Sequence, residues 1–428
     1  MSELNSLSEL SSRPKFTGRR LVKIDPDATH QTISSRAKNA SIRLASFSDY
    51  SEDDEDFTRA FEDSDGIFFD GFRIAVVNEN RHFQVSQLTE SSKTKSTFLY
   101  SEPERFIYAF QNITDLSSKR INTISEALVD KRNESKTGHI FTDDNIGSWA
   151  MHSINIINSK YTGKGVNIAI LDTGFNLNHP DFSGRSVSSK SFISGEEVND
   201  QNGHGSHCIG LAAGNINHVT KVRYGVAKGA NIFAGKVLSN EGSGSDSSIL
   251  AGMEWAITNH CRIISMSLGA EVFPGESYSN IYNDIAKRAL AKGTLIIAAA
   301  GNESRRDKGM ISPVGHPANC PAIMAVAALD RKLNVAYFSC GGLNPDGGQV
   351  DIAAPGVDVY SSWKEPSEYN TISGTSMATP ITAGVAALFC EAYPGSSASD
   401  IWMYITQNAM RLDINSSDIG AGFIQPPK

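Results

Sequence analysis

Short runs of apolar residues, each long enough for one strand, constrain the fold of this chain more than any other feature. Three of them lie at residues 166–171, 263–268 and 294–300 and are rich in Ile, Val, Leu and Ala. Patterns with helical spacing lie near them, at residues 247–259 and 280–292. Apolar strands that alternate with helices predict a parallel sheet that helices cover on both faces.

The chain has 428 residues, enough for this large α/β domain and for an accessory module. The predicted parts are a disordered tail (1–18), a small α+β module (19–110), a linker (111–143) and the large domain (144–428). Within the module we expect strands and short helices, the strands at 21–24, 72–77 and 106–110 and the helices at 37–44 and 83–88.

The charge and composition exclude several classes of partner. The formal net charge is -8 and no run of Lys or Arg is present, so we expect no nucleic-acid binding. No apolar run is long enough to cross a bilayer, so we expect no membrane contact. The polar N-terminus lacks the apolar core of a secretory signal, which predicts a cytoplasmic protein with reduced cysteines. Export by a signal-independent route and a disulfide pair among the five cysteines are the alternatives.

Asp172 and Asn302 each follow or end a predicted buried strand. Functional groups gather at the carboxyl ends of strands in parallel α/β sheets. Asp172 opens an Asp-Thr-Gly segment that also occurs in aspartic proteases, and a lone Asp there is usually a turn residue. Asn302 is a neutral amide donor suited to an oxyanion, although an Asn after Gly is most often a simple turn residue.

His204 lies between Gly203 and Gly205 and precedes a run of small residues, which predicts a tightly packed helix that begins at this histidine. His207 offers a second imidazole, so a metal site is an alternative. The spacing lacks the i, i+4 geometry and the glutamate of the His-Glu-x-x-His motif, and this counts against a metal.

Ser376 stands in the segment Gly374–Pro380, immediately before an apolar helix. The backbone N–H groups at a helix N-terminus are free and can stabilise an oxyanion beside a serine. The alternative is that Ser376 is an ordinary helix cap.

In combination these segments resemble the subtilisin-like peptidase family. The order Asp, His, Ser along the chain is the order found in subtilisin. The resemblance runs from about Trp149 to Pro427 and is carried by residues 169–174, 202–207, 300–303 and 374–380. One departure is Ser206, where the family usually has Thr between the two histidines. The resemblance implies a subtilisin-like parallel sheet flanked by helices.

The resemblance also implies a serine endopeptidase that works through an acyl-enzyme. Ser376 is then the nucleophile, His204 the general base and acid, and Asp172 the group that orients His204. Asn302 and the backbone N–H of Ser376 are implied as the oxyanion hole. This chemistry requires no cofactor, and its partners are protein or peptide substrates.

Members of the family bind substrate as an extended strand between two backbone segments. By resemblance these segments are Ser243-Gly244 and Ser267-Leu268-Gly269. Gly315 is implied at the base of the main specificity pocket, where a glycine leaves room for a large apolar or aromatic side chain. Asp246 falls where the family often has a bulky residue, and it either favours basic or polar groups in a more distal pocket or simply caps the next helix.

Two further residues resemble known features of the family. Cys208, close after His204, resembles the thiol of its thiol-containing members and predicts partial inactivation by mercurials; a core residue without chemistry is the alternative. Asp181 falls where members often bind structural calcium, with Asn215 and Asn217 as further ligands, or it is an ordinary turn residue.

The N-terminal module is open to two interpretations. Residues 21–28 resemble the opening strand of the prodomains that subtilisin-like enzymes commonly carry. A prodomain would make this chain a zymogen whose own module is an intramolecular inhibitor, with the processing site at 111–143. An unrelated adaptor is the alternative.

Two other functions fit less of the sequence. A non-catalytic binding protein on the same fold leaves the presence of all four catalytic groups unexplained. Half of an aspartic protease, built on Asp172, leaves the other three motifs unexplained.

Overall fold

The computed structural model describes residues 15–50, 57–78, 97–110 and 140–428. The C-terminal part is built around a seven-stranded sheet with the order β14-β13-β12-β10-β6-β8-β7. Every neighbouring pair in this sheet is parallel. Its strands, from one edge to the other, are Ile352–Pro355, Met324–Leu329, Leu295–Ala299, Ile263–Met266, Asn167–Asp172, Asn231–Lys236 and Val187–Ser191.

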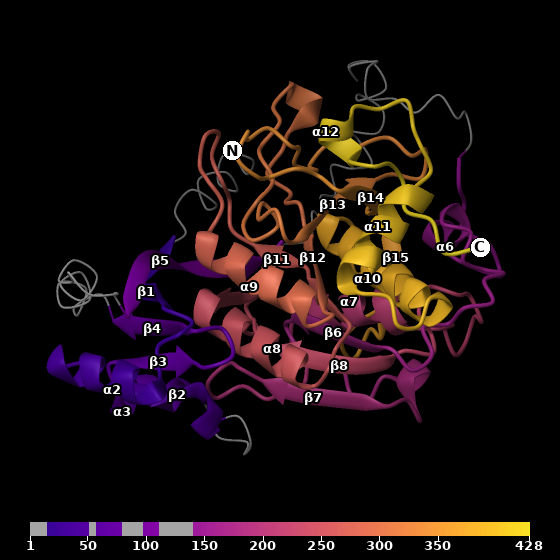
Figure 1. The fold of residues 1–428 in the computed structure, drawn as a ribbon. Helices are drawn as coiled ribbons and strands as arrows, with labels where there is room; N and C mark the ends of the chain where they lie inside the picture. The colour runs from indigo at the N-terminus through magenta and orange to yellow at the C-terminus, as the bar shows by residue number, and fades with distance from the viewer. Residues whose placement is uncertain (1–14, 51–56, 79–96, 111–139) are drawn as a thin grey trace, which may run out of the picture.

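Helices cover both faces of this sheet, as the apolar strands require. Figure 1 shows α8 and α9 on the side of the N-terminal module, and α7 and α10 on the other side. The central strands β10, β12 and β13 are buried along their whole length, which explains their unbroken apolar sequence. The helices are α6 (Trp149–Ser153), α7 (His204–Ala213), α8 (Asp246–Thr258), α9 (Asn280–Ala291), α10 (Thr375–Ala392), α11 (Ala398–Asn408) and α12 (Ser416–Ile419).

The predicted strand at 263–268 divides into two strands that serve different sheets. After β10 the chain passes Ser267 and pairs again as β11 (Leu268–Gly269), now with the N-terminal module. The remaining short elements of this part are β9 (Ser243–Ser245), β15 (Val359–Ser362), β16 (Tyr369–Ile372) and the 3-10 turns η5 (Pro180–Phe182) and η6 (Arg306–Lys308).

In its described residues, the N-terminal module combines a sheet with the helix α2 and several shorter elements. The sheet order is β11-β5-β1-β4-β3-β2, and β9 also pairs with β5, at residues 106–108. The elements are β1 (Phe16–Ile24), α2 (His30–Asn39), β2 (Leu44–Ser46), η1 (Phe47–Tyr50), η2 (Phe57–Arg59), α3 (Ala60–Asp63), β3 (Gly66–Phe69), β4 (Ile74–Asn78) and β5 (Phe98–Ala109).

Two expectations for this module need correction. The helix predicted at 37–44 ends at Asn39, because Ser41 adopts a left-handed backbone with φ 57 and Leu44 already lies in a strand. The tail predicted at 1–18 overlaps β1, which begins at Phe16 and pairs with β5. The helix predicted at 83–88 and residues 111–139 of the linker lie outside the described residues.

The sheet of the module is apolar on both faces. Val22, Ala75 and Val77 pack with α2 in a small core that belongs to the module alone. Their neighbours Leu21 and Val76 point the other way and join the large core of the chain. Successive side chains of these strands thus point to opposite faces of the sheet. The face that carries Leu21 and Val76 is buried only while the module is docked on α8 and α9.

No helix of the described residues has the length and apolarity needed to cross a membrane. All five cysteines are buried and unpaired.

Candidate active site

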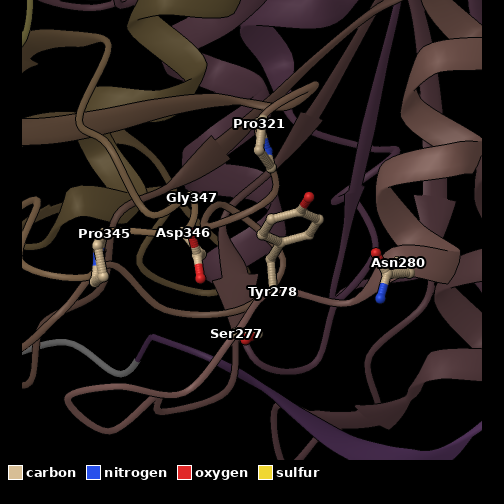
Figure 2. Close-up of a pocket in the computed structure, with 7 residues that line it drawn as sticks. All are labelled: Ser277, Tyr278, Asn280, Pro321, Pro345, Asp346 and Gly347. Atoms are coloured by element: carbon tan, nitrogen blue, oxygen red, sulfur yellow. The ribbon is translucent and has the colours of Figure 1, made fainter.

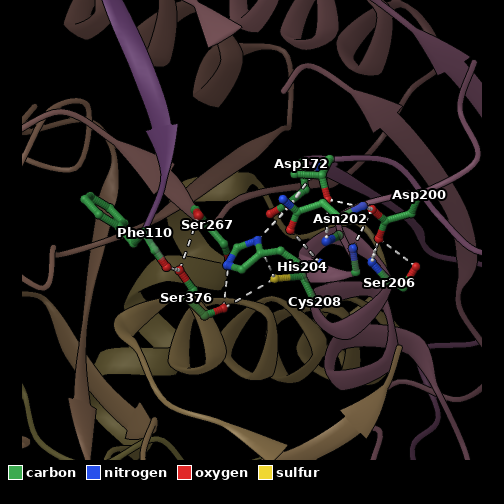
Figure 3. Close-up of polar contacts among 12 residues, drawn as sticks. Phe110, Asp172, Asp200, Asn202, His204, Ser206, Cys208, Ser267 and Ser376 are labelled. Atoms are coloured by element: carbon green, nitrogen blue, oxygen red, sulfur yellow. Dashed lines mark hydrogen bonds and ion pairs between the residues drawn. The ribbon is translucent and has the colours of Figure 1, made fainter. Parts of the chain in front are cut away.

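The ends of strands and the starts of helices bring the predicted catalytic residues together. Asp172 is the last residue of β6, and His204 is the first residue of α7. Ser376 is the second residue of α10, and Asn302 follows β12. Figure 3 shows Asp172, His204 and Ser376 close to one another, with Phe110 beside the serine.

Asp172 and His204 form a buried pair. His204 Nδ1 lies 2.7 Å from Asp172 Oδ1, and both side chains are almost fully buried. Burial by itself would lower the pKa of His204, but the charge of Asp172 and its hydrogen bond outweigh burial and raise the pKa well above its ordinary value. His204 Nε2 has no hydrogen-bond partner among the described residues, so it is free to serve a reacting group.

Glycines around His204 are required by close backbone contacts. Gly203 has φ 103. A Cβ on Gly205 would lie 2.3 Å from the carbonyl oxygen of Gly174, so a larger residue would push α7 away from the loop after Asp172.

A buried carboxylate that the sequence did not single out fixes this arrangement. Asp200 accepts hydrogen bonds from the Thr173 hydroxyl at 3.0 Å, from Gly203 N at 2.8 Å and from both the backbone N and the hydroxyl of Ser206 at 2.8 Å. Asp200 thereby connects the loop after Asp172 to the first turn of α7. Its one sequence signal is a carboxylate placed just before the glycine-flanked histidine.

The same network explains why serine is suitable at position 206. The Ser206 hydroxyl donates to Asp200 and accepts from Asn176 N at 2.8 Å. Both bonds use the hydroxyl, which threonine and serine share.

Lys236 is a second polar residue that sequence reasoning missed. It ends β8, is fully buried, and donates from Nζ to the carbonyl oxygen of Thr173 at 2.7 Å. Glu196 lies 3.1 Å from the same ammonium group and balances its charge. A lysine at the end of a buried strand was the available signal.

The Ser376 hydroxyl points into the cleft. Its Oγ donates to the carbonyl oxygen of Phe110 at 3.4 Å and to that of Ser267 at 3.3 Å. It makes no hydrogen bond to His204 in this arrangement, in which the N-terminal module fills the cleft.

Asn302 is oriented so that its amide nitrogen is free. The backbone N and the hydroxyl of Thr375 both donate to Asn302 Oδ1 at 2.9 Å. Asn302 Nδ2 is buried and has no hydrogen-bond partner among the described residues. A buried donor without a partner beside Ser376 is what an oxyanion hole requires.

The predicted substrate-binding segments hold a strand of this same chain. Residues of β5 pair antiparallel with β9 on one side, where Ile107 faces Gly244 and Tyr108 faces Ser243. On the other side β5 pairs with β11, where Ala109 faces Leu268. The strand therefore lies between the two backbone segments named from the sequence, Ser243-Gly244 and Ser267-Leu268-Gly269.

The side chain of Phe110 fills the predicted specificity pocket. A Cβ added to Gly269 would lie 2.5 Å from the Phe110 ring, and one added to Gly315 would lie 3.6 Å from it. The aromatic ring therefore lies against these two glycines, and the role of Gly315 in substrate specificity stays a prediction.

Cys208 lies one helical turn after His204 and behind the pair. Its Sγ is 3.9 Å from His204 Nδ1 and donates to the carbonyl oxygen of Ser376 at 3.6 Å. Burial raises the pKa of Cys208 above its ordinary value, so the group is a neutral thiol. Inactivation by mercurials remains a prediction.

The second histidine of the motif does not face the site. His207 Nε2 donates to the carbonyl oxygens of Val359 at 3.1 Å and of Asn370 at 3.2 Å. Burial, and then the charge of His204, lower the pKa of His207 to about 3. His207 is thus a neutral core residue, and a metal site formed by the histidine pair gains no support.

Asp181 is surrounded by hydrogen-bond donors rather than by further metal ligands. Tyr224 donates to its Oδ2 at 2.7 Å, Tyr369 to its Oδ1 at 2.9 Å, and the backbone N of His218 to Oδ1 at 2.8 Å. Burial is the main cause that raises the pKa of both tyrosines, so the hydroxyls stay protonated. These residues do not fit a calcium ion, which needs several oxygen ligands at once.

The partners proposed for such an ion are also engaged elsewhere. The side-chain oxygen of Asn217 accepts from the backbone N of Val219 and of Thr220, both at 2.7 Å. The backbone carbonyl of Asn215 accepts from Tyr224 N at 3.1 Å. Calcium at Asp181 therefore stays a prediction, with geometry against it.

A pocket elsewhere on the surface does not belong to this site. Figure 2 shows it near the start of α9, and its lining residues are Ser277, Tyr278, Asn280, Pro321, Pro345, Asp346 and Gly347. None of the catalytic groups lines it.

Comparisons with known proteins agree with this geometry. Residues 163–423 match the profile of the Subtilase family. The chain is 38% identical over 265 residues to "Subtilisin DY" of Bacillus licheniformis, which covers 62% of this chain and 90% of that protein. It is 34% identical over 358 residues to "Subtilisin-like protease 3" of Pseudogymnoascus destructans, covering 76% of this chain and 82% of that protein. The solved structure of "Sphericase" matches with a TM-score of 0.55 and 32% identity over 65% of this chain and 97% of that one.

Proposed function

The chain belongs to the subtilase family and is a subtilisin-like serine peptidase, and from this premise we propose that it is made as a zymogen and cuts peptide bonds with Asp172, His204, Ser376 and Asn302. In this family the hydrolysis is carried out by side chains and needs no cofactor for catalysis. The observation that carries the proposal is the placement of the Phe110 carbonyl at the Ser376 hydroxyl, beside the buried Asp172–His204 pair.

The proposed reaction begins when the side chain of Ser376 turns towards the free Nε2 of His204. Ser376 Oγ attacks the carbonyl carbon of the substrate while its proton passes to His204 Nε2. The resulting imidazolium is stabilised by Asp172. His204 then gives the proton to the departing amine, the C–N bond breaks, and an acyl-enzyme forms. Water attacks this ester with His204 again as the base, which releases the acid and restores Ser376.

Negative charge develops on the carbonyl oxygen in both halves of the reaction. Asn302 is the proposed donor for this oxyanion. Thr375 donates two hydrogen bonds to the side-chain oxygen of Asn302, whose Nδ2 has no partner among the described residues and can therefore donate to the substrate. The backbone N of Ser376, in the first turn of α10, is the second proposed donor.

The N-terminal module is proposed as the inhibitor and as the first substrate. Its last strand runs through the cleft in the place of a substrate, with Phe110 in the specificity pocket. The proposed processing site is the bond that follows Phe110. This bond joins Phe110 to the first residue of the 111–143 segment, within which the processing site is expected from the sequence.

Charged contacts support a docked module. Glu104 is fully buried and accepts from the backbone N of Ser247, in the first turn of α8. Glu102 accepts from the Ser279 hydroxyl and from the backbone N of Ile281, at the start of α9. A carboxylate is favourable at a helix N-terminus, because the free N–H groups and the helix dipole both attract negative charge.

A relative shares part of the region that precedes the peptidase domain. The match to "Subtilisin-like protease 3" covers 76% of this chain, which is more than residues 144–428 provide. That match therefore extends into the region before the peptidase domain.

The experiment compares the full chain, Ser376→Ala and, as a matched control, Ser189→Ala, an exposed serine on β7. We expect the full chain and the control to be cut, to give a fragment that begins at residue 111, and to react with a fluorophosphonate. The Ser376→Ala chain should stay intact and unlabelled. Labelling without cleavage would refute the zymogen proposal, and failure of the purified full chain both to cut and to label would refute the catalytic assignment.

A further inference from the structure

A buried carboxylate contacts the strand β5 at Arg105, away from the end at which Phe110 meets Ser376. Asp246 opens α8 and is fully buried. Its Oδ2 accepts from the backbone N of Arg105 at 2.8 Å, and the Arg105 guanidinium lies 3.9 Å from the same oxygen. The catalytic sequence motifs do not include this group, and the proposed chemistry does not use it.

The surroundings of Asp246 leave it charged. Burial would raise the pKa of Asp246, but His316 and Arg105 outweigh burial and hold the pKa below its ordinary value. Burial, and next the charge of Arg105, lower the pKa of His316. His316 Nε2 lies 3.4 Å from Asp246 Oδ1, without hydrogen-bond geometry. Arg105, whose guanidinium is always charged, is the permanent cation next to Asp246.

The site lacks full hydrogen bonding even with Arg105 in place. Asp246 Oδ1, both ring nitrogens of His316, the Tyr282 hydroxyl and Arg105 Nη1 are buried without a hydrogen-bond partner among the described residues. Buried polar groups are normally satisfied, so this cluster has donor and acceptor capacity in reserve for a polar side chain.

Removal of the module takes the cation of Arg105 away from Asp246. Arg105 and Glu102, which lies 4.0 Å from the guanidinium, are both on β5 and depart together. Asp246 and His316 stay with the peptidase domain. A substrate that lies in the place of β5 covers Asp246 again, and a carboxylate covered without a cation is unfavourable, so a substrate that brings its own cation to this position gains binding energy.

The position of that cation along a substrate follows from the register of β5. With Phe110 counted as the first residue before the cut bond, Arg105 is the sixth. Ile107 faces Gly244 and Phe106 faces Ser245, so the strand stays paired with β9 up to the residue next to Arg105. A substrate that binds in the same register places its own sixth residue at Asp246.

We propose that Asp246 is a specificity-determining residue that selects an arginine or lysine at the sixth position before the cut bond. This proposal rests on the proposed function, because it takes the strand of the module as the guide to the substrate. The enzyme would then read two substrate positions: a large apolar side chain immediately before the cut bond, and a positive charge at the sixth position before that bond.

The test uses two internally quenched peptides. Both contain residues 104–110 followed by a short polar segment, and they differ only in having Arg or Gln at the position of Arg105. We expect the processed wild-type enzyme to cut the Arg peptide with a kcat/KM about tenfold higher, the effect of one favourable charge pair worth about 1.4 kcal/mol. Asp246→Asn keeps an acceptor for the backbone N–H but removes the charge, and should bring the ratio of the two peptides to about one.

Glu254→Gln is the matched control. It replaces a carboxyl group of the same helix by an amide, but Glu254 contacts Gly71 of the module and not Arg105. The control should keep the tenfold ratio. Equal kcat/KM values for the two peptides with the wild-type enzyme would overturn the inference while leaving the peptidase assignment intact, and so would an unchanged ratio in Asp246→Asn. If neither peptide is cut, the proposed function fails, and this inference fails with it.

Discussion

Replacement of Phe110 by alanine is the sharpest test of where the module is cut. The Phe110 side chain is only 6% exposed, and its ring rests against the positions at which Gly269 and Gly315 have no side chain. Full burial of a phenylalanine side chain contributes roughly 1.5–3 kcal/mol. If that energy is used to hold the bond at Ser376, its loss should slow self-cleavage about 10- to 150-fold.

The assay follows the appearance of the N-terminal fragment after synthesis of the full chain. The amount of fragment is divided by the amount of soluble uncut chain, so that differences in folding yield do not affect the rate. Leu99→Ala is the control, because Leu99 lies on the same strand but is 43% exposed and far along β5 from the cleft. Leu99→Ala should be processed at the rate of the wild type. Equal rates for Phe110→Ala and Leu99→Ala, or a mature N-terminus at another residue, would refute the assignment of Phe110 to the specificity pocket.

Three further predictions concern the catalytic groups and the proposed calcium ligand. Asn302→Ala should lower kcat by about 10²–10³ with little change in KM, the range established for the oxyanion asparagine of subtilisin, and steady-state kinetics with a chromogenic peptide would test it. Asp172→Asn should lower kcat by about 10⁴. Because Asp172 raises the pKa of His204 and catalysis needs neutral His204, this variant should also move the acid limb of the kcat profile to lower pH, and an unmoved limb would contradict the pair. A chelator should change the Tm by less than about 3 °C, whereas Asp181→Asn should lower the Tm by several degrees in differential scanning calorimetry, because the donors around Asp181 then lose their charged acceptor. A large loss of Tm with the chelator alone would indicate a metal at Asp181 after all.

Local patterns carried most of what could be predicted about the peptidase domain. Strands β6, β10 and β12 appear where apolar runs stood, because a strand buried on both faces must be apolar throughout. Asp172, His204 and Ser376 could be predicted because each stands in a short sequence motif, and the neighbours within that motif are needed to position its side chain. Gly205, for example, is a glycine because the carbonyl of Gly174 approaches it.

Residues that act through distant partners gave much weaker signals. Asp200 and Lys236 look like ordinary polar residues in the sequence, and their importance lies in bonds to Thr173 and Ser206. The beginning of β1 was assigned to a tail because its hydrogen bonds go to β5, which comes much later in the chain. No local pattern records a pairing of that kind.

The sequence by itself determined the class of fold and the family, and it predicted the catalytic groups and the kind of side chain for the main pocket. Each of these depends on residues that are neighbours along the chain or on the alternation of buried strands. Tertiary structure alone decided that Phe110 meets Ser376, that Glu104 meets α8, and that Arg105 meets Asp246. The physical reason is that these contacts join segments separated by more than a hundred residues, whose relative position depends on the packing of the whole chain.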